Sequence, residues 1–352
     1  MFFTSWGGIF ITRVLRWCTL AGITAGLLGL TVPASGATGW TVVTPPASTA
    51  GAALTGSFAL SYTDAWVVGG PVSAGAAPVA LNWNGTAWSS VPTPTPSGST
   101  PDWVLKSVAA SSSTDAWAVG EQVAGTKIHN SLYEHWNGTS WSVVTGPNEG
   151  ILNAVLDFSP TNAWAFADFS VLHWNGKKWS VASGAIASLA VSADGPGDIW
   201  GVYRNDQVIH YNGKSWSVST LGGPVGTVFE SVDALSPTDV WVGGGIDGGG
   251  PVLEHFNGTS WHVMTTPSSF SGAGVFAIAA RSDSDVWIFS VHDPLTAAVL
   301  LAHWNGSSWT TSPSPIPADR SVSIGSAASS PSHVWLFGTD NTTGEPMILS
   351  HS

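Results

Sequence analysis

Cysteine and charge are both scarce in this chain of 352 residues. Cys18 is the only cysteine, and 10 Lys and Arg stand against 22 Asp and Glu, which gives a formal net charge of −12. A disulfide framework needs paired cysteines, so that class of protein is excluded. Nucleic-acid binding draws much of its affinity from Lys and Arg contacts to phosphates, so the acidic balance predicts no nucleic-acid partner.

Aromatic and turn-forming residues are abundant instead, with 21 Trp, 41 Gly and 22 Pro. Disordered chains are poor in aromatic residues, and coiled coils and helical bundles are dominated by Ala, Glu, Lys, Leu and Arg. The composition therefore predicts a globular, turn-rich, all-β protein.

The first 37 residues have the features of a secretory signal peptide. Arg13 and Arg16 precede a mostly apolar run from Cys18 to Val32, and a small-x-small cleavage site ends at Ala37. The run is shorter than the roughly 20 apolar residues that a membrane span needs. We predict export by the Sec route, cleavage near Ala37 and a secreted protein without any thiol, with an uncleaved membrane anchor as the alternative.

One unit of sequence recurs along residues 38–352. Its hairpin signature is an aromatic residue, Asn-Gly, two further residues and a Trp, as in Trp136 to Trp141, and an earlier signature places Asp115 two residues before Trp117. The Trp of the earlier signature occurs in seven copies: Trp66, Trp117, Trp164, Trp200, Trp241, Trp287 and Trp335. The segment at Trp40 matches the end of a unit, and Met347 to His351 matches its middle, so the seventh unit is split between the two ends.

Each unit contains four expected strands, which in the second copy are residues 105–110, 116–120, 132–136 and 140–144. Four-stranded units of about 40–50 residues with periodic aromatics are typical of propeller blades. We predict that residues 38–352 form one domain, a seven-bladed β-propeller of four-stranded antiparallel blades. Pairing of the N-terminal strand, about Trp40-Thr44, with the C-terminal three strands closes the ring and removes an exposed edge.

These residues resemble the kelch-like, galactose-oxidase-central-domain-like propeller repeats of secreted bacterial proteins. Gly69-Gly70 and Gly243-Gly244 match the Gly-Gly doublet that kelch repeats carry after their second strand. The resemblance implies a propeller scaffold and leaves the function open. The Tyr–Cys cofactor of a galactose-oxidase type of copper enzyme is not expected, because the exported chain has no cysteine.

The repeated side chains are expected to have structural roles. Asn137-Gly138 predicts a two-residue type I′ hairpin, in which Trp136 and Trp141 lie diagonally and pack as core. We expect Asp115 and its equivalents to bond amides of the turn that precedes the second strand, and His135 and its equivalents to make one structural hydrogen bond each. No metal site is predicted, since these histidines lie one to a blade.

Binding is expected where the repeat is broken. The connections between second and third strands, and those between blades, vary in length and content and should share one rim of the ring. Asp168 and Glu121 are expected near it. The candidate ligand-binding residues on this rim are Trp103, Tyr203, Arg204, Asp206, Phe270 and His292.

The sequence predicts a secreted, monomeric binding propeller that recognises an extracellular glycan or protein through the variable rim, without cofactor or metal. No catalytic residue is assigned. The first alternative is an extracellular carbohydrate-active enzyme, a lyase or hydrolase, for which Asp206 with His292 is a candidate acid–base pair. The second alternative is a structural or surface-display protein.

Overall fold

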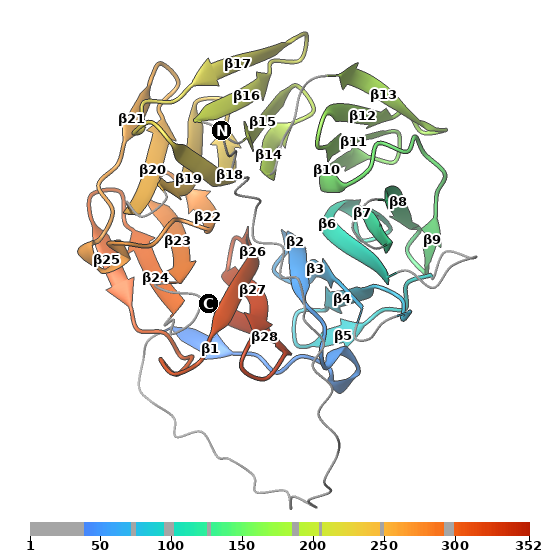
Figure 1. Ribbon diagram of the computed structural model, residues 1–352, viewed down its shortest axis with the longest axis horizontal. Coiled ribbons are helices and arrows are strands. Elements are labelled where there is room, and N and C mark those ends of the chain that lie inside the picture. Colours follow the sequence, from blue (N-terminus) through green and yellow to red (C-terminus); the bar gives the residue numbers. More distant parts are fainter. Residues whose placement is uncertain are drawn as a thin grey trace, which may run out of the picture. The chain divides into compact units, whose positions relative to one another are not determined.

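Seven four-stranded antiparallel sheets stand around a common axis, as the sequence predicts (Figure 1). The structure is a computed structural model, and it describes residues 39–71, 75–94, 102–124, 128–184, 190–203, 206–246, 250–291 and 299–352. Thr38–Ser352 form one compact unit. Its only described helices are the short 3-10 turns Ala47–Thr49 and Ser268–Phe270.

The first three blades follow each other along the chain from the innermost to the outermost strand. Blade 1 consists of β2 (Leu54–Ser61), β3 (Asp64–Gly69), β4 (Val79–Trp83) and β5 (Trp88–Ser90). Blade 2 consists of β6 (Asp102–Ser112), β7 (Asp115–Ala124), β8 (Ile128–Trp136) and β9 (Trp141–Val143). Blade 3 consists of β10 (Leu152–Ser159), β11 (Asn162–Ala167), β12 (Ser170–Trp174) and β13 (Trp179–Gly184).

The next three blades have the same order of strands. Blade 4 consists of β14 (Ala190–Gly195), β15 (Asp198–Tyr203), β16 (Gln207–Tyr211) and β17 (Trp216–Thr220). Blade 5 consists of β18 (Thr227–Ser236), β19 (Asp239–Ile246), β20 (Gly250–Phe256) and β21 (Trp261–Val263). Blade 6 consists of β22 (Ala277–Ser282), β23 (Asp285–Val291), β24 (Val299–Trp304) and β25 (Trp309–Ser312).

Blade 7 joins the two ends of the chain, which confirms the predicted closure. Its strands are β26 (Val322–Ser330), β27 (His333–Asp340), β28 (Glu345–His351) and, outermost, β1 (Trp40–Val42). β1 pairs antiparallel with β28, and Trp40 lies opposite His351. The N-terminal strand thereby covers the edge that β28 would otherwise expose.

The blades are joined by the Trp of each second strand, which inserts into the hairpin aromatics of the following blade. The Trp66 ring lies 5.2 Å from both Trp136 and Trp141, measured between ring centroids, and Trp117 lies 4.9 Å from Trp174 and from Trp179. Equivalent contacts are made by Trp164, Trp200, Trp241 and Trp335, whose partners are in blades 4, 5, 6 and 1. At the closing blade, Trp287 meets Trp40 edge-on at 5.1 Å.

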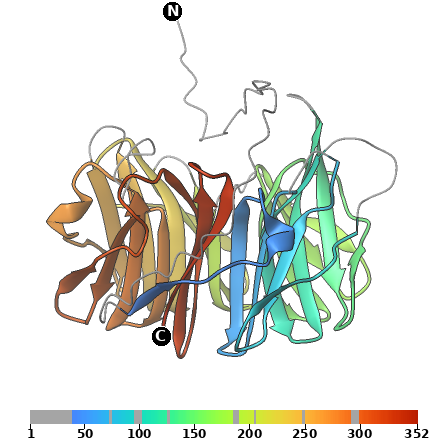
Figure 2. The ribbon, with the colours of Figure 1, turned by 90° about the horizontal axis from the view of Figure 1, so that it is seen from below.

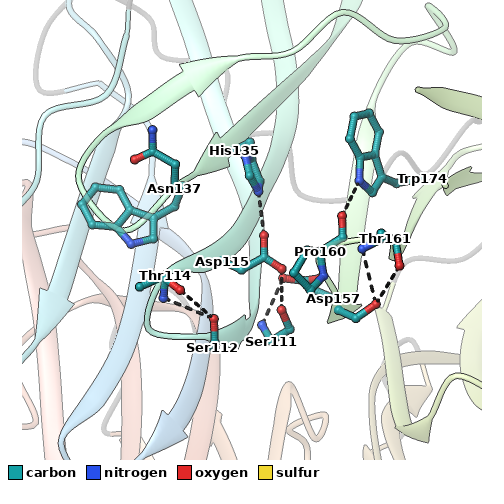
Figure 3. A network of polar contacts seen from close by, with 12 residues as sticks. Ser111, Ser112, Thr114, Asp115, His135, Asn137, Asp157, Pro160, Thr161 and Trp174 are labelled. Carbon is teal, nitrogen blue, oxygen red and sulfur yellow. Dashed lines mark hydrogen bonds and ion pairs between the residues drawn. The ribbon is translucent and has the colours of Figure 1, made fainter. Parts of the chain in front are cut away.

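The repeated histidine fixes this Trp within its own blade. His135 packs its ring on Trp117 at 4.6 Å and donates Nε2 to Asp115 Oδ1 at 2.7 Å (Figure 3). Blades 4, 5 and 6 repeat the His–Asp bond at 2.7–2.9 Å, and in blade 3 His173 bonds the Asn162 side chain instead. The single structural hydrogen bond expected of these histidines is confirmed in these five blades. The expected partner of Asp115 was wrong, because His135 and the Ser111 hydroxyl bond its carboxylate in place of turn amides.

The Asn-Gly hairpin differs from the predicted type I′ turn. Trp136 pairs directly with Trp141, so the loop has four residues and the two indoles lie opposite each other. Asn137 Oδ1 accepts hydrogen bonds from the backbone amides of residues 139 and 140 at 2.9 and 3.0 Å. Gly138 alone takes a positive φ, of 90°. The asparagine is therefore needed for its side-chain oxygen, which closes the turn without the left-handed backbone of a type I′ turn.

We expect Trp40→Ala to destabilise the ring by about 3–5 kcal/mol, the usual cost of truncating a buried Trp. Trp40 is buried and packs edge-on against Trp287 and Phe289 of blade 6. The measurement is the free energy of unfolding in urea. The control is Thr41→Ala on the same strand, an exposed position where a change within about 0.5 kcal/mol is expected. Equal losses in the two variants would contradict the closing role of Trp40.

Candidate functional site

The connections of variable length meet at one rim of the ring, which we call the variable rim. Asn148, in the connection from β9 to β10, donates Nδ2 to Asn130 Oδ1 at 2.8 Å, and Asn130 lies on β8 close to the β7–β8 connection. The two kinds of connection named by the sequence are therefore neighbours. Figure 2 shows the ring from the side, with the strands running between this rim and the opposite one, which carries the Asn-Gly hairpins. We call the opposite rim the turn rim.

The innermost strands of all seven blades line a central channel of about 220 Å³. In five blades this strand contains a β-bulge near the variable rim, whose extra residue is Thr55, Lys106, Asn153, Glu230 or Gly325. A bulge changes the direction of its side chain relative to the regular alternation. These five residues all line the channel, and they differ in chemistry from blade to blade.

The channel wall has a polar arc and a mainly apolar arc. Blades 7, 1, 2 and 3 supply hydroxyl, ammonium and amide groups, and blades 4, 5 and 6 supply mostly hydrocarbon. The polar arc includes Thr55, Ser57, Lys106, Ser107, Asn153 and Ser326. The apolar arc includes Ala190, Val191, Val232, Phe276, Ala277 and Ile278. Glu230 is the charged residue of the apolar arc.

Glu230 and Lys106 differ in their environment. Lys106 Nζ lies 3.3 Å from Glu121 Oε1, so the ammonium is compensated. Glu230 is accessible from the channel but has protein on its sides, and this partial desolvation raises the pKa of its carboxyl to about 7. The channel therefore holds a carboxyl group that changes its charge near neutral pH.

Polar side chains continue from the channel onto the variable rim at blades 2 and 3. Asn153, in the channel, donates Nδ2 to Asp168 Oδ1 at 2.9 Å. Asn130 Nδ2 donates to Gln122 Oε1, and Ser170 Oγ donates to Glu149 Oε2 at 2.9 Å. Together with Asn148, these bonds hold amide and carboxylate groups in fixed directions. We refer to Gln122, Asn130, Asn148, Glu149, Asn153, Asp168, Phe169 and Ser170 as the blade 2–3 patch.

Exposed apolar side chains also occur on the variable rim. Phe169, in the β11–β12 turn, has 72% of its surface exposed and follows Asp168. Val225 and Val228, near the start of β18, are also exposed on the variable rim. An exposed aromatic side chain surrounded by ordered hydrogen-bonding groups is the usual composition of a protein-binding surface.

The structure places the predicted ligand-binding residues in different settings. Trp103 is 8% exposed and belongs to the apolar cluster between blades 1 and 2 that also contains Trp66, and Phe270 is fully buried in the cluster between blades 5 and 6 that also contains Trp241. The expectation that these two side chains stand on the rim surface was wrong, because both fill space between blades. Arg204 and His292 lie outside the described residues, as does the side chain of Tyr203.

Asp206 does lie on the variable rim, at the β15–β16 turn. It has a positive φ of 54°, a conformation that Asp tolerates better than most residues. Its backbone amide donates to Thr227 O, and its carbonyl oxygen accepts from the Leu221 amide at 2.8 Å. Asp206 thereby joins two connections of the rim, and its role toward a ligand stays a prediction.

The channel residues and Phe169 were not among the candidate ligand-binding residues predicted from the sequence. An alignment of the inner strands would have shown that one position changes from Thr55 to Lys106, Asn153, Glu230 and Phe276, while its neighbours stay small or apolar. Such variation within a repeat is a detectable signal. The β-bulge that turns these side chains into the channel has no sequence signature of its own here.

Several carboxyl groups away from this region also have raised pKa values. Burial raises the pKa of Asp157 to about 8, with a contribution from Asp115, and raises the pKa of Asp233 to about 6. Asp157 accepts from the Ser111 amide of the preceding blade (Figure 3), and Asp233 accepts from the Ala280 amide of the following one. Because both connect the inner strands of neighbouring blades, we assign them to the scaffold.

Two further findings concern only the part of the chain that the structure describes. There, no group of three or more His, Cys, Asp or Glu side chains is arranged to hold a metal ion. No helix there has the length and apolar character needed to cross a membrane.

Comparison with known proteins supports the fold. No family model and no curated protein match the sequence. Among solved structures, YCF48 bound to D1 peptide is similar with a TM-score of 0.65 at 14% identity, over 91% of this chain and 99% of that one. The GH74 xyloglucanase of Xanthomonas campestris has a TM-score of 0.60 at 13% identity, over 88% of this chain and 55% of that one. The WD40 propeller of Doa1 has a TM-score of 0.59 at 11% identity, with 89% and 95% covered.

Replacement of Glu134 tests whether a buried carboxyl without a hydrogen-bond partner destabilises the fold. It takes the position of Leu81 and Leu172 in blades 1 and 3, both carboxylate oxygens lack a hydrogen-bond partner, and burial raises its pKa from 4.5 to about 8. A raised folded pKa means that the protein loses stability as pH rises from about 4.5 toward 8. Glu134→Leu should therefore raise the free energy of unfolding at pH 8 by more than about 1.4 kcal/mol, the value of one pKa unit.

The matched control is Glu254→Leu at the same position of blade 5. Glu254 accepts a hydrogen bond from the Gly222 amide at 3.1 Å, so its replacement leaves that amide without a partner. We expect Glu254→Leu to be less stable than Glu134→Leu by about 1–3 kcal/mol in urea unfolding. A loss of stability in Glu134→Leu at pH 8 would show that the Glu134 carboxylate makes a stabilising interaction in the folded protein.

Proposed function

We propose that this chain is an exported, non-catalytic propeller that binds an extracellular protein through its variable rim. The observation that carries the proposal is the blade 2–3 patch, where exposed Phe169 stands beside amide and carboxylate groups held by hydrogen bonds. Fixed polar groups lose little conformational freedom on binding, and an aromatic anchor supplies buried area.

A protein ligand fits this surface better than a glycan. Sugar stacking needs exposed aromatic faces, and Trp103 and Phe270, which the sequence suggested for that purpose, are buried. The aromatic side chain that the described rim does expose, Phe169, lies between Asp168 and Ser170, whose side chains are hydrogen-bonded to Asn153 and Glu149. The similar propeller YCF48 was solved bound to D1 peptide, which supports a peptide as a ligand for a propeller of this fold.

We also propose that the chain is exported and that its repeats are of the kelch-like kind. The signal peptide of residues 1–37 lies outside the described residues, and its cleavage near Ala37 stays a prediction. An N-terminus beginning near residue 38, found by mass spectrometry of the secreted protein, is the expected result. A chain that keeps Arg13 and remains in the membrane fraction would favour the anchored alternative.

The binding function is tested by exposing the full chain to arrays of purified extracellular proteins and of glycans. We expect a protein binder whose Kd weakens by about tenfold or more in Phe169→Ser, as for an interface anchor. The matched control is Tyr62→Ser, because Tyr62 is 59% exposed but lies at the opposite, turn rim. Its Kd should stay unchanged.

Two outcomes would contradict the proposal. Equal weakening by the two substitutions would show that the variable rim is not the binding surface. Binding and turnover of a polysaccharide such as xyloglucan, with no protein bound, would support the carbohydrate-active alternative instead.

A further inference from the structure

The apolar arc of the channel contains a charged residue, Glu230, that is not part of the blade 2–3 patch. Glu230 stands beside hydrocarbon side chains, with Val232 on its own strand, Phe276 directly before β22 and Ile278 on β22. Its carboxyl forms no hydrogen bond or ion pair with any described residue. This carboxyl faces the channel beside apolar side chains, so a cation carried by a ligand in the channel can reach it.

None of the charged protein groups described around Glu230 neutralises its carboxylate. Among the described residues that line the channel, Lys106 is the other charged one; its strand β6 stands three blades away from β18 (Figure 1), and its ammonium is bound to Glu121. Arg281, on the neighbouring β22, pairs with Asp285 at 2.8 Å near the turn rim. Asp233 on β18, Asp194 on β14 and Asp239 on β19 are acidic and lie outside the lining of the channel.

From this arrangement we infer that Glu230 binds the ammonium group of a lysine side chain that the protein ligand inserts into the channel. This inference rests on the proposed function and names the contact that the ligand makes beyond the rim. A lysine combines a hydrocarbon stem with a compact charge. Its stem matches the apolar arc, and its ammonium matches the single carboxylate within that arc.

The size and shape of the channel agree with this occupant. Its volume of about 220 Å³ accepts a single side chain but no folded segment. The bulge in β18 directs Glu230 to the lumen, so an unbranched side chain entering from the variable rim would reach it. An arginine would bring a broad planar fork that prefers two acceptor oxygens with further polar neighbours, which the apolar arc does not provide.

The charge of Glu230 makes this contact dependent on pH. Partial desolvation by the channel wall raises the pKa of Glu230 to about 7, whereas a lysine stays protonated to much higher pH. Ammonium binding favours the ionised carboxylate, so affinity should rise with pH up to about 7 and level off above it. At pH 6 the affinity should be about tenfold below its value at pH 8.

The test uses the full chain and the acetylated, amidated peptide Gly-Ser-Lys-Ser-Gly, with binding followed by fluorescence anisotropy or calorimetry. We expect binding to weaken about tenfold or more in Glu230→Gln and with the ε-acetyl-lysine form of the peptide, which keeps the stem and loses the charge. The pH dependence should disappear in Glu230→Gln. Asp283→Asn, an exposed acid at the turn rim that removes the same charge, should leave binding unchanged.

Three results would overturn the inference. Equal affinity for the lysine and acetyl-lysine peptides would show that the ammonium is not recognised. Binding of a glucosamine tetramer in place of the peptide, with the same dependence on Glu230, would assign the channel to an amino sugar. Wild-type affinity in Glu230→Gln, combined with Phe169-dependent protein binding on the array, would reject the lysine contact and leave the proposed function standing.

Discussion

The insertion of one Trp into the hairpin of the next blade is the interaction on which the ring depends. Trp66 shows it between blades 1 and 2, and the same contact recurs at every boundary between blades. Such aromatic pairs add about 0.5–1.5 kcal/mol each beyond the area that they bury. Because every blade needs a following blade to receive its Trp, the series is complete only as a closed ring. Trp40 satisfies this need for blade 6, which explains why the N-terminal strand is part of blade 7.

This constraint also determines which residues are free for function. The Trp, its stacked histidine, the paired Asp115-type carboxylate and the Asn-Gly turn all have structural partners. The positions that vary between blades are the channel bulges and the rim connections. Glu230 and Phe169 both belong to this second group, as a channel-facing carboxyl beside apolar side chains and an aromatic ring in solvent. Both the proposed interface and the proposed lysine contact use residues that the scaffold does not need.

The sequence predicted the fold well, since its repeat is a direct consequence of the blade structure. Seven Trp signatures, the split unit and the variable rim all follow from spacing alone. The hairpin was wrong in detail because Asn137 has two ways to stabilise a turn, through its backbone or through its side chain. The structure shows the second way.

The site was less predictable because burial of a residue in a connection depends on neighbouring blades. Trp103 and Phe270 break the repeat as a surface residue would, yet they are buried in apolar clusters that also contain Trp66 and Trp241, which are distant in sequence. Asp168 was expected near the rim and is found bonded to Asn153 there. The direction of Glu230 follows from a bulge, which depends on strand pairing and not on local sequence.

The most direct test of the account is hydrogen exchange of the full chain with and without the saturating lysine peptide. We predict that the bound peptide slows exchange of backbone amides in β18 and at the mouth of the channel on β6 and β10, and leaves exchange in the Asn-Gly hairpins of the turn rim unchanged. Protection confined to the turn rim, or to the outer strands, would contradict the claim that binding occurs where the repeat is broken.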